Sequence, residues 1–220
     1  MSDRTIRFAG VAGIVFVVLI LITVFSTGSP PMADDPVDKI RAFLVDHRSA
    51  LLLSNVIAFA SIPFVLWFAV VLRELVRGDR TANALGTLSL AGLLVTGPMA
   101  MAGGAIQEAP IYVKGVADKM SDDTLRVVFE TQLLLFSATS AGIIAFALGA
   151  AFAIRRTGAL PTYVMWLGFV AAIGNAVALL SALSSGAAGI GILGLLTFAL
   201  FILVAGIAMA AGKATPAATS

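Results

Sequence analysis

Six long apolar segments alternate with short polar segments along the chain. Each apolar run has about the length that a bilayer core requires, roughly 20 residues in a helix, so the pattern predicts membrane-spanning helices joined at the membrane surfaces. The predicted fold class is all-α: a polytopic membrane protein built as a six-helix transmembrane bundle in a single domain. The expected spans are residues 8–26, 50–72, 84–107, 131–154, 161–183 and 189–211.

The first apolar run has a second interpretation. Arg4 and Arg7 precede the run, and residues 29–33 offer a poor cleavage site, as in a secretory signal peptide. The run is longer than the usual apolar region of a signal peptide, roughly 7–15 residues, which favours a retained span. Cleavage would leave five spans and the same orientation.

Two polar segments are long enough to contain structure of their own. Residues 30–48 predict a short amphipathic helix lying in the membrane interface, with Asp35 as its N-cap and Pro36 at its first position. Residues 108–130 predict an outer loop. In its second half, a helix is expected to begin after an N-cap at Ser121 and to continue into the fourth span.

Composition supports a membrane protein and excludes several kinds of chemistry. The chain is 60% hydrophobic and 12% charged, with a mean hydropathy of +1.03, whereas about a quarter of the residues in soluble domains are charged. The absence of cysteine excludes disulfides, iron–sulfur clusters and thiolate zinc sites. A single histidine argues against a haem held by two histidines of this chain. No cofactor, metal or nucleic-acid partner is expected, and the lipid bilayer is the expected environment.

The distribution of charge predicts the orientation of the chain. If the N-terminus is cytoplasmic, most arginines fall on inner segments and nine of the twelve carboxylates on outer ones. The positive-inside rule then places both termini in the cytoplasm, and the short polar tail at residues 212–220 is expected to be disordered. The excess of Arg over Lys, with abundant Ala and Gly, is typical of bacteria with GC-rich genomes. The expected location is therefore a bacterial plasma membrane.

The chain matches itself at an offset of 82 residues. Residues 51–53 align with 133–135, Arg73 with Arg155, and Gly92 with Gly174. The match predicts that spans two and three and spans four and five are two copies of one hairpin, related as a parallel repeat. Shared apolar composition, with a basic loop in each hairpin, would also explain it.

Small residues recur at helical spacing in the fourth and fifth spans. Such residues allow helix backbones to approach closely in lipid, either inside the bundle or at a face between two copies of the chain. The positions are Ala141, Ala145, Gly149 and Ala153 in the fourth span and Gly168, Ala172 and Ala176 in the fifth.

The candidates for a ligand or proton site lie at the outer rim. His47, Glu108, Glu130 and Gln132 fall near one membrane depth, at the ends of spans two, three and four. Two carboxylates and an imidazole could handle a proton or bind a cation; the alternative is that they are ordinary interfacial caps. The sequence contains no metalloprotease or nucleophile-elbow spacing, so no catalytic residue or metal site is predicted.

Two asparagines lie inside spans, where uncharged polar side chains most often hydrogen-bond between helices. They are Asn55 and Asn175. Together with the helix breaks expected at Pro63 and Pro98, they could instead frame a cavity between the two hairpins.

The loop at residues 72–82, which reads LRELVRGDRTA, and the Leu85-Gly86 pair that follows it carry a family resemblance. With its six-span layout, the chain resembles an uncharacterised family of bacterial six-span membrane proteins known only as a domain of unknown function. The resemblance implies the architecture and no particular activity.

These patterns predict a non-enzymatic integral membrane protein that acts by association, as an accessory or assembly subunit of a membrane complex or as a homo-oligomer. The alternative is a small transporter, or a protein that binds lipid or another apolar ligand in a cavity between the hairpins. A membrane-embedded enzyme that uses Glu108, Glu130 and His47 is a third hypothesis.

Overall fold

A computed structural model describes residues 1–181, 183 and 191–217, and within these residues the chain is helical with no strand. Two short helices, α2 (Val37–Asp46) and α5 (Val116–Lys119), accompany six helices that are long and apolar enough to cross a membrane. The predicted fold class is confirmed. The long helices are α1 (Asp3–Ser26), α3 (Arg48–Leu75), α4 (Arg80–Tyr112), α6 (Asp122–Thr157), α7 (Thr162–Ser181) and α8 (Gly191–Ala210).

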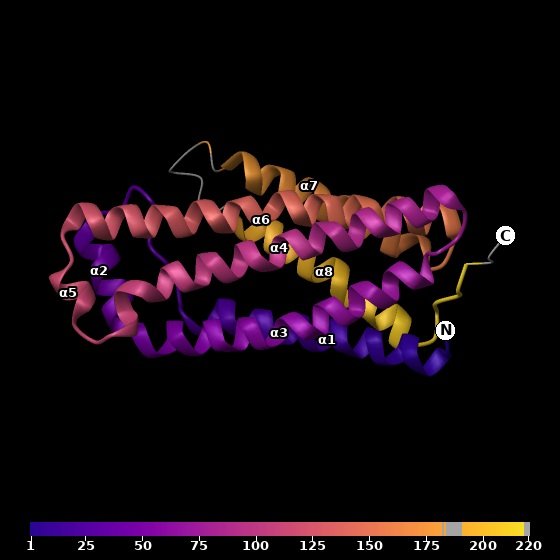
Figure 1. Ribbon diagram of the computed structural model, residues 1–220, viewed down its shortest axis with the longest axis horizontal. Helices are drawn as coiled ribbons and strands as arrows, with labels where there is room; N and C mark the ends of the chain where they lie inside the picture. Colours follow the sequence, from indigo (N-terminus) through magenta and orange to yellow (C-terminus); the bar gives the residue numbers. More distant parts are fainter. Residues whose placement is uncertain (182, 184–190, 218–220) are drawn as a thin grey trace.

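The six long helices run along the long axis of the bundle (Figure 1). Around the bundle axis, each helix packs against the next in the order α3, α1, α8, α7, α6, α4. Contacts between α4 and α3 close the ring. Aromatic rings fill the centre: Phe146 of α6 lies 5.8 Å from Phe198 and 5.9 Å from Phe201, and Phe198 lies 6.2 Å from Phe16 of α1, between ring centroids. Helix α1 thus supplies one wall of the bundle and part of its core.

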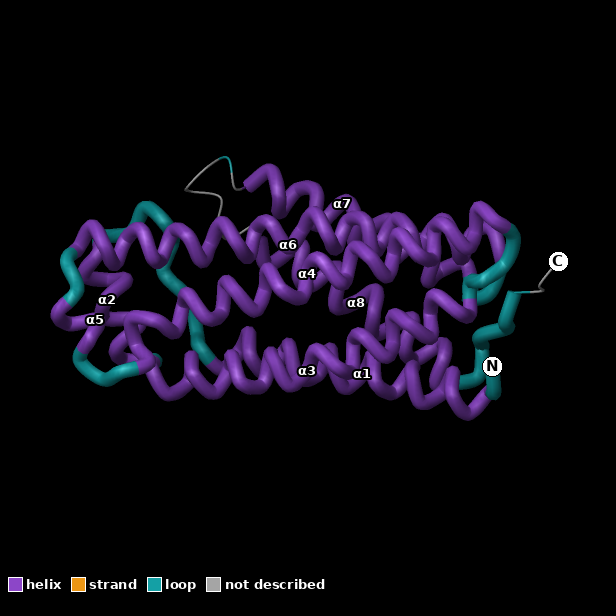
Figure 2. The backbone as a smooth tube through the Cα atoms, viewed as in Figure 1, coloured by secondary structure: helices purple, strands orange, loops and turns teal. Residues whose placement is uncertain are grey.

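The helices differ in length. At 1.5 Å per residue, α7 and α8, of 20 residues each, are about 30 Å long and match the thickness of a bilayer core. The 33 residues of α4 and 36 of α6 give lengths of about 50 and 54 Å. Both chain termini lie at one end of the bundle, here called the terminal end, and α2 and α5 lie at the other, the cap end (Figure 2). Because α6 finishes in Arg155 and Arg156 at the terminal end, its extra length projects from the cap end.

The connection between α4 and α6 is shorter than the predicted loop at 108–130. Helix α4 continues through Pro110 to Tyr112, and α6 begins at Asp122, where Ser121 accepts a hydrogen bond from the Thr124 amide. The predicted N-cap and helical run-in are confirmed. The loop prediction was too long because hydropathy marks where an apolar stretch ends, whereas a helix can continue into water.

The amphipathic segment at 30–48 differs from its prediction in two respects. Asp35 does not cap α2: the helix begins after Pro36, while the Asp35 carboxylate accepts from the Met32 amide at 2.7 Å and pairs with Lys39 at 2.8 Å. The apolar face of α2 does not lie open to lipid either. Its Ile40 is fully buried in a cluster with residues of α3 to α6, so protein covers the apolar face that the sequence assigns to the membrane interface.

The tail predicted to be disordered is ordered as far as residue 217. The amide of Thr215 donates to the Ala159 carbonyl at 3.0 Å, and the amide of Ala217 donates to the Leu75 carbonyl at 3.2 Å. Leu75 is the last residue of α3, where carbonyls lack an intrahelical donor, so the tail satisfies a group that a short polar sequence did not reveal. Residues 218–220, and the turn predicted between spans five and six, lie outside the described residues.

An ion pair also joins the loops at the terminal end. Asp79 caps α4 by accepting from the Ala82 amide at 2.8 Å, and the Arg156 Nε donates to its two oxygens at 2.9 and 2.7 Å. The hydrogen bonds from Arg156, and then from Ala82, lower the pKa of Asp79 to about 2. Because the pKa of Asp79 is lower in the folded protein than in the unfolded chain, the ionised carboxylate stabilises the fold. This stabilisation is complete above the ordinary aspartate pKa of about 4 and is lost as the pH falls through about 2.

The small residues of the fourth and fifth spans pack inside the bundle. A Cβ atom built on Gly149 would lie 2.7 Å from both the Leu85 carbonyl and the Ser89 amide of α4, and one on Gly168 would lie 2.9 Å from Ala151. Of the predicted positions, Gly149, Ala153, Gly168 and Ala172 are buried, Ala145 and Ala176 are half-buried, and only Ala141 is exposed.

The internal repeat is not confirmed. Gly92 and Gly174, which the repeat aligns, lie against different partners: Gly92 against the backbone of α6, and Gly174 against Thr197 of α8. Helices α6 and α7 also pack together more extensively than α3 and α4. The repeat stays a prediction.

The closest backbone contact between α4 and α6 yields a test. A Cβ atom on Gly92 would lie 2.6 Å from the Phe146 amide nitrogen, so Gly92→Ala must push the two helices apart. We expect a loss of about 1–3 kcal/mol in unfolding free energy, measured by denaturant or thermal unfolding in detergent micelles.

Ala91→Leu is the matched control. Ala91 is the neighbouring residue on α4 and is exposed on the outside of the bundle, so a larger side chain there should change stability by no more than about 0.5 kcal/mol. Equal stability of Gly92→Ala and the wild type would show that the two backbones are not in contact.

Candidate functional site

The cap end contains a second hydrophobic cluster, separate from the main core. It joins α2, α5, the start of α3, the end of α4 and the first turns of α6. Burial of these apolar side chains gives the cap a core of its own. The buried members are Ile40, Phe43, Leu44, Leu51, Ile111, Ala117, Leu125 and Phe129.

Arginine side chains bind the backbone carbonyls that the cap helices leave without partners. The Nε of Arg48 donates to the Ile111 carbonyl at 2.6 Å, and its Nη2 donates to the Tyr112 carbonyl at 2.8 Å. These are the last carbonyls of α4, which have no intrahelical donor, and a cation is favourable at the negative end of the helix dipole. Arg48 therefore fixes the end of α4 against the start of α3.

Arg41 and Arg126 do the same for the rest of the cap. Arg41 donates to the carbonyls of Ala117 and Met120 and pairs with Asp122 at 2.7 Å, which joins α2, α5 and α6. Arg126 donates to the carbonyls of Ala33 and Asp35 at 2.9 and 3.0 Å, tying the segment before α2 to α6. The three arginines of the cap thus hold its backbone.

The predicted rim residues have separate partners in the structure, and their role as one site stays a prediction. The His47 Nδ1 lies 3.1 Å from the Phe43 carbonyl, and its ring stacks on Phe43, whereas Glu130 pairs with Arg126 at 3.7 Å. Glu108 is half-buried and makes no hydrogen bond or ion pair with any described residue. In the part of the chain that the structure describes, no three His, Cys, Asp or Glu side chains are grouped so that they could hold a metal ion.

Gln132 is the most deeply placed of the rim candidates. It is only 3% exposed, and its amide has no hydrogen-bond partner among the described residues. It faces the interior of the bundle about one turn from Phe136, whose ring lies 3.2 Å from a Cβ atom built on Gly103 of α4.

The two asparagines inside the spans hydrogen-bond between helices. Asn55 of α3 donates to the Gly104 carbonyl of α4 at 3.1 Å. Asn175 of α7 donates to the Ala171 carbonyl of its own helix and to the Gly194 carbonyl of α8, both at 2.9 Å. A small pocket of about 90 Å³ lies at the cap and another of about 70 Å³ at the terminal end, and neither is lined by an asparagine.

An exposed apolar patch surrounds the cap pocket. We define the cap patch as Val45, Tyr112, Val113 and Val116, which are 39, 71, 59 and 37% exposed; Val45 and Val113 also line the pocket. Tyr112 follows the expected third span, residues 84–107, by five residues, so we expect it about 8 Å beyond the hydrocarbon. Sequence reasoning missed this patch, although Tyr112 and Val113, followed directly by Lys114, were a visible signal.

Comparison with protein-family models, with curated proteins and with solved structures finds no match to this chain. The class of the protein therefore rests on its fold, which is that of a multi-pass membrane protein with six helices able to span a bilayer. The resemblance to a bacterial six-span family stays a prediction.

The role of Arg48 can be tested by hydrogen exchange. Arg48→Gln removes the donors to the Ile111 and Tyr112 carbonyls, each worth roughly 1.5–3 kcal/mol as a charged hydrogen bond. We expect peptides covering residues 105–120 to exchange about tenfold faster or more, while the membrane-spanning parts are unchanged.

Lys114→Gln serves as the control, because Lys114 lines the same pocket and has no hydrogen-bond or ion-pair partner among the described residues. Identical exchange in both variants would contradict the capping role of Arg48.

Proposed function

We propose that this protein acts by association, as a non-enzymatic accessory or assembly subunit that docks another membrane protein on its cap. The observation that carries the proposal is the cap patch. Its side chains lie outside the hydrocarbon, where lipid tails do not cover them, and exposed apolar patches rimmed by polar residues mark protein–protein contacts. Lys114 and Asp118 line the adjoining pocket and supply such a rim.

The construction of the cap supports docking as a rigid body. Arg48 fixes one part of the patch, because it joins the start of α3 to the carbonyls of Ile111 and of Tyr112, which is itself a patch residue. A preorganised surface loses less conformational freedom on binding than a flexible loop does. The arginines that fix the cap therefore also favour recognition.

The small-residue faces offer less support for a homo-oligomer. Gly149 and Gly168, the closest of these contacts, are used between helices of one bundle. Of the predicted positions, only Ala141 remains exposed for a second copy of the chain. This favours the cap over the membrane-spanning surface as the place of association.

The location that we propose follows the charge distribution. Arg4, Arg7, Arg80 and Arg155 lie at the terminal end, which the positive-inside rule assigns to the cytoplasm of a bacterial plasma membrane. The cap then faces the outside, and its partner must expose a complementary apolar surface there.

Site-specific photo-crosslinking in native membranes tests the proposal. A photoreactive residue at Val113 should yield one discrete adduct, because a specific partner presents the same atoms in every complex. The control probe stands at Val95, which is 56% exposed at about the middle of the same helix and should meet only lipid.

Co-expression of two differently tagged copies shows whether the adduct contains a second copy of this chain, as a homo-oligomer would. Val113→Asp should abolish association without changing the stability of the bundle. Absence of any protein adduct at Val113, or the same adducts from both probes, would contradict docking on the cap.

A further inference from the structure

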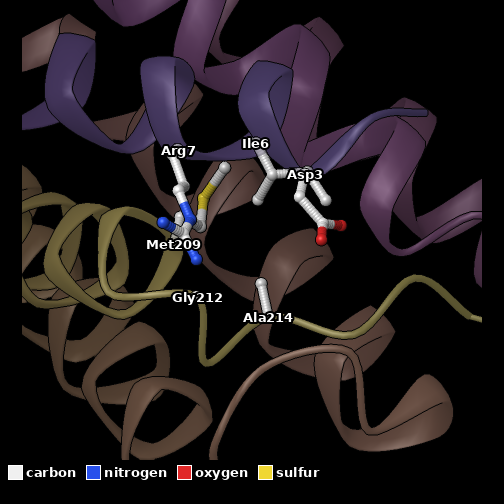
Figure 3. Close-up of a pocket in the computed structure, with 6 residues that line it drawn as sticks. All are labelled: Asp3, Ile6, Arg7, Met209, Gly212 and Ala214. Atoms are coloured by element: carbon white, nitrogen blue, oxygen red, sulfur yellow. The ribbon is translucent and has the colours of Figure 1, made fainter.

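A small polar pocket lies at the terminal end, between the first turns of α1 and the chain that follows α8 (Figure 3). Its volume is about 70 Å³. The buried side chains of Ile6 and Met209 form its apolar part, and Asp3 and Arg7 supply its charges. Gly212 and Ala214 complete it from the side of the C-terminal segment.

The two charged groups of the pocket are unengaged. Asp3 and Arg7 are four residues apart on α1, a spacing at which opposite charges commonly pair, yet neither makes an ion pair or hydrogen bond with a described residue. Both side chains reach from α1 toward the C-terminal segment, with the carboxylate and the guanidinium apart (Figure 3). The pocket thus presents one positive and one negative group to a ligand.

The backbone around the pocket leaves room for the guanidinium. Gly212 has a φ of +72°, a left-handed conformation that favours glycine, and a Cβ atom built on it would lie 3.1 Å from the Arg7 Nη2. The amide of Lys213 donates to the Ala208 carbonyl at 2.9 Å, so the chain turns back below α1. A larger residue at 212 would crowd Arg7.

Several other cations at this end already have partners. Arg73 and Arg77 pair with Glu74, Arg156 pairs with Asp79, and the Arg4 guanidinium lies 5.7 Å from the centre of the Phe8 ring. Arg80, Arg155 and Lys213 lack such partners, but they do not line the pocket. Arg7 is therefore the cation that a ligand in the pocket would meet.

The pocket lies at the depth of lipid headgroups. Arg7 immediately precedes the apolar run of α1, whose first residue, Phe8, is 58% exposed on the outside of the bundle. Arg7 is thus one residue from the edge of the hydrocarbon, where lipid phosphates lie. A lipid could occupy the pocket with its headgroup while its acyl chains stay in the bilayer beside α1.

We propose that this pocket binds a membrane phospholipid whose headgroup carries both a phosphate and an ammonium, such as phosphatidylethanolamine. The guanidinium of Arg7 donates to the phosphate oxygens, a match that suits its planar fork of N–H groups. The carboxylate of Asp3 accepts from the ammonium. A phospholipid with a phosphate but no ammonium would still accept hydrogen bonds from the Arg7 guanidinium. Its negative charge, however, would lie near the Asp3 carboxylate with no ammonium to pair with that carboxylate. This inference is independent of docking on the cap.

Native mass spectrometry of the detergent-purified full chain tests the proposal with two lipids that share the same acyl chains, phosphatidylethanolamine and phosphatidylglycerol. The wild type should bind the ethanolamine lipid more tightly. Arg7→Gln should weaken both lipids about tenfold, as expected for the loss of a charged hydrogen bond. Asp3→Asn should remove the preference, lowering phosphatidylethanolamine and leaving phosphatidylglycerol equal or stronger.

Arg4→Gln is the matched control, since Arg4 lies on the same helix turn and does not line the pocket; it should leave binding of both lipids unchanged. Melting temperatures of all variants show whether the bundle is intact, and Arg7→Lys should retain part of the phosphate affinity.

Four results would overturn the proposal. Three concern the lipids: equal binding of the two lipids by the wild type, unchanged binding after Arg7→Gln, and an equal loss after Arg4→Gln. The fourth concerns the source of the headgroup: displacement of the lipid by an equimolar concentration of soluble glycerophosphoethanolamine, which has no acyl chains, would show that the ligand is not a membrane lipid.

Discussion

The structure depends on the direct backbone contact between α4 and α6. In a bilayer the lipid tails are as apolar as the side chains, so helices associate through close packing and hydrogen bonds rather than through the hydrophobic effect. Gly92 and Gly149 bring the two backbones together, and the Thr96 hydroxyl, which donates to the Gly92 carbonyl of its own helix at 3.0 Å, lies 3.4 Å from the Thr139 carbonyl of α6. These are also the two longest helices, so their contact carries them together beyond the membrane and fixes where the cap is built.

The cap follows from what happens to helix ends outside the bilayer. Helices that project into water end in carbonyls without donors, and Arg41, Arg48 and Arg126 supply the donors while α2 covers the apolar side chains. The outcome is a rigid surface that nevertheless leaves Tyr112 and Val113 exposed. The proposal of docking on the cap rests on this combination of a backbone held by three arginines and apolar side chains that remain exposed. At the opposite end, by contrast, Asp3 and Arg7 form no ion pair with any described residue.

The sequence was sufficient for the membrane-spanning architecture but not for the cap. Apolar runs of bilayer length predicted six helices, and the Ser121 cap and acidic first turn of α6 were recognised because helix N-termini have a local signature. The length of α4 past residue 107, the burial of α2 and the order of the tail depend on partners distant in the chain, which a local pattern does not contain. Glu108 and His47 are candidates for a ligand or proton site by residue type and by their expected membrane depth alone. Their different neighbours could be known only from the fold.

If a partner docks on the cap, it covers the cap patch in the native membrane. Because the chain contains no cysteine, a single cysteine at Val113 can be labelled with a membrane-impermeant maleimide before and after purification, with a cysteine at the exposed Asp123 as reference. We expect Val113→Cys to react slowly in native membranes and rapidly once purified, while Asp123→Cys reacts rapidly in both. Equal labelling of Val113→Cys in native membranes and in the purified protein would rule out docking on the cap.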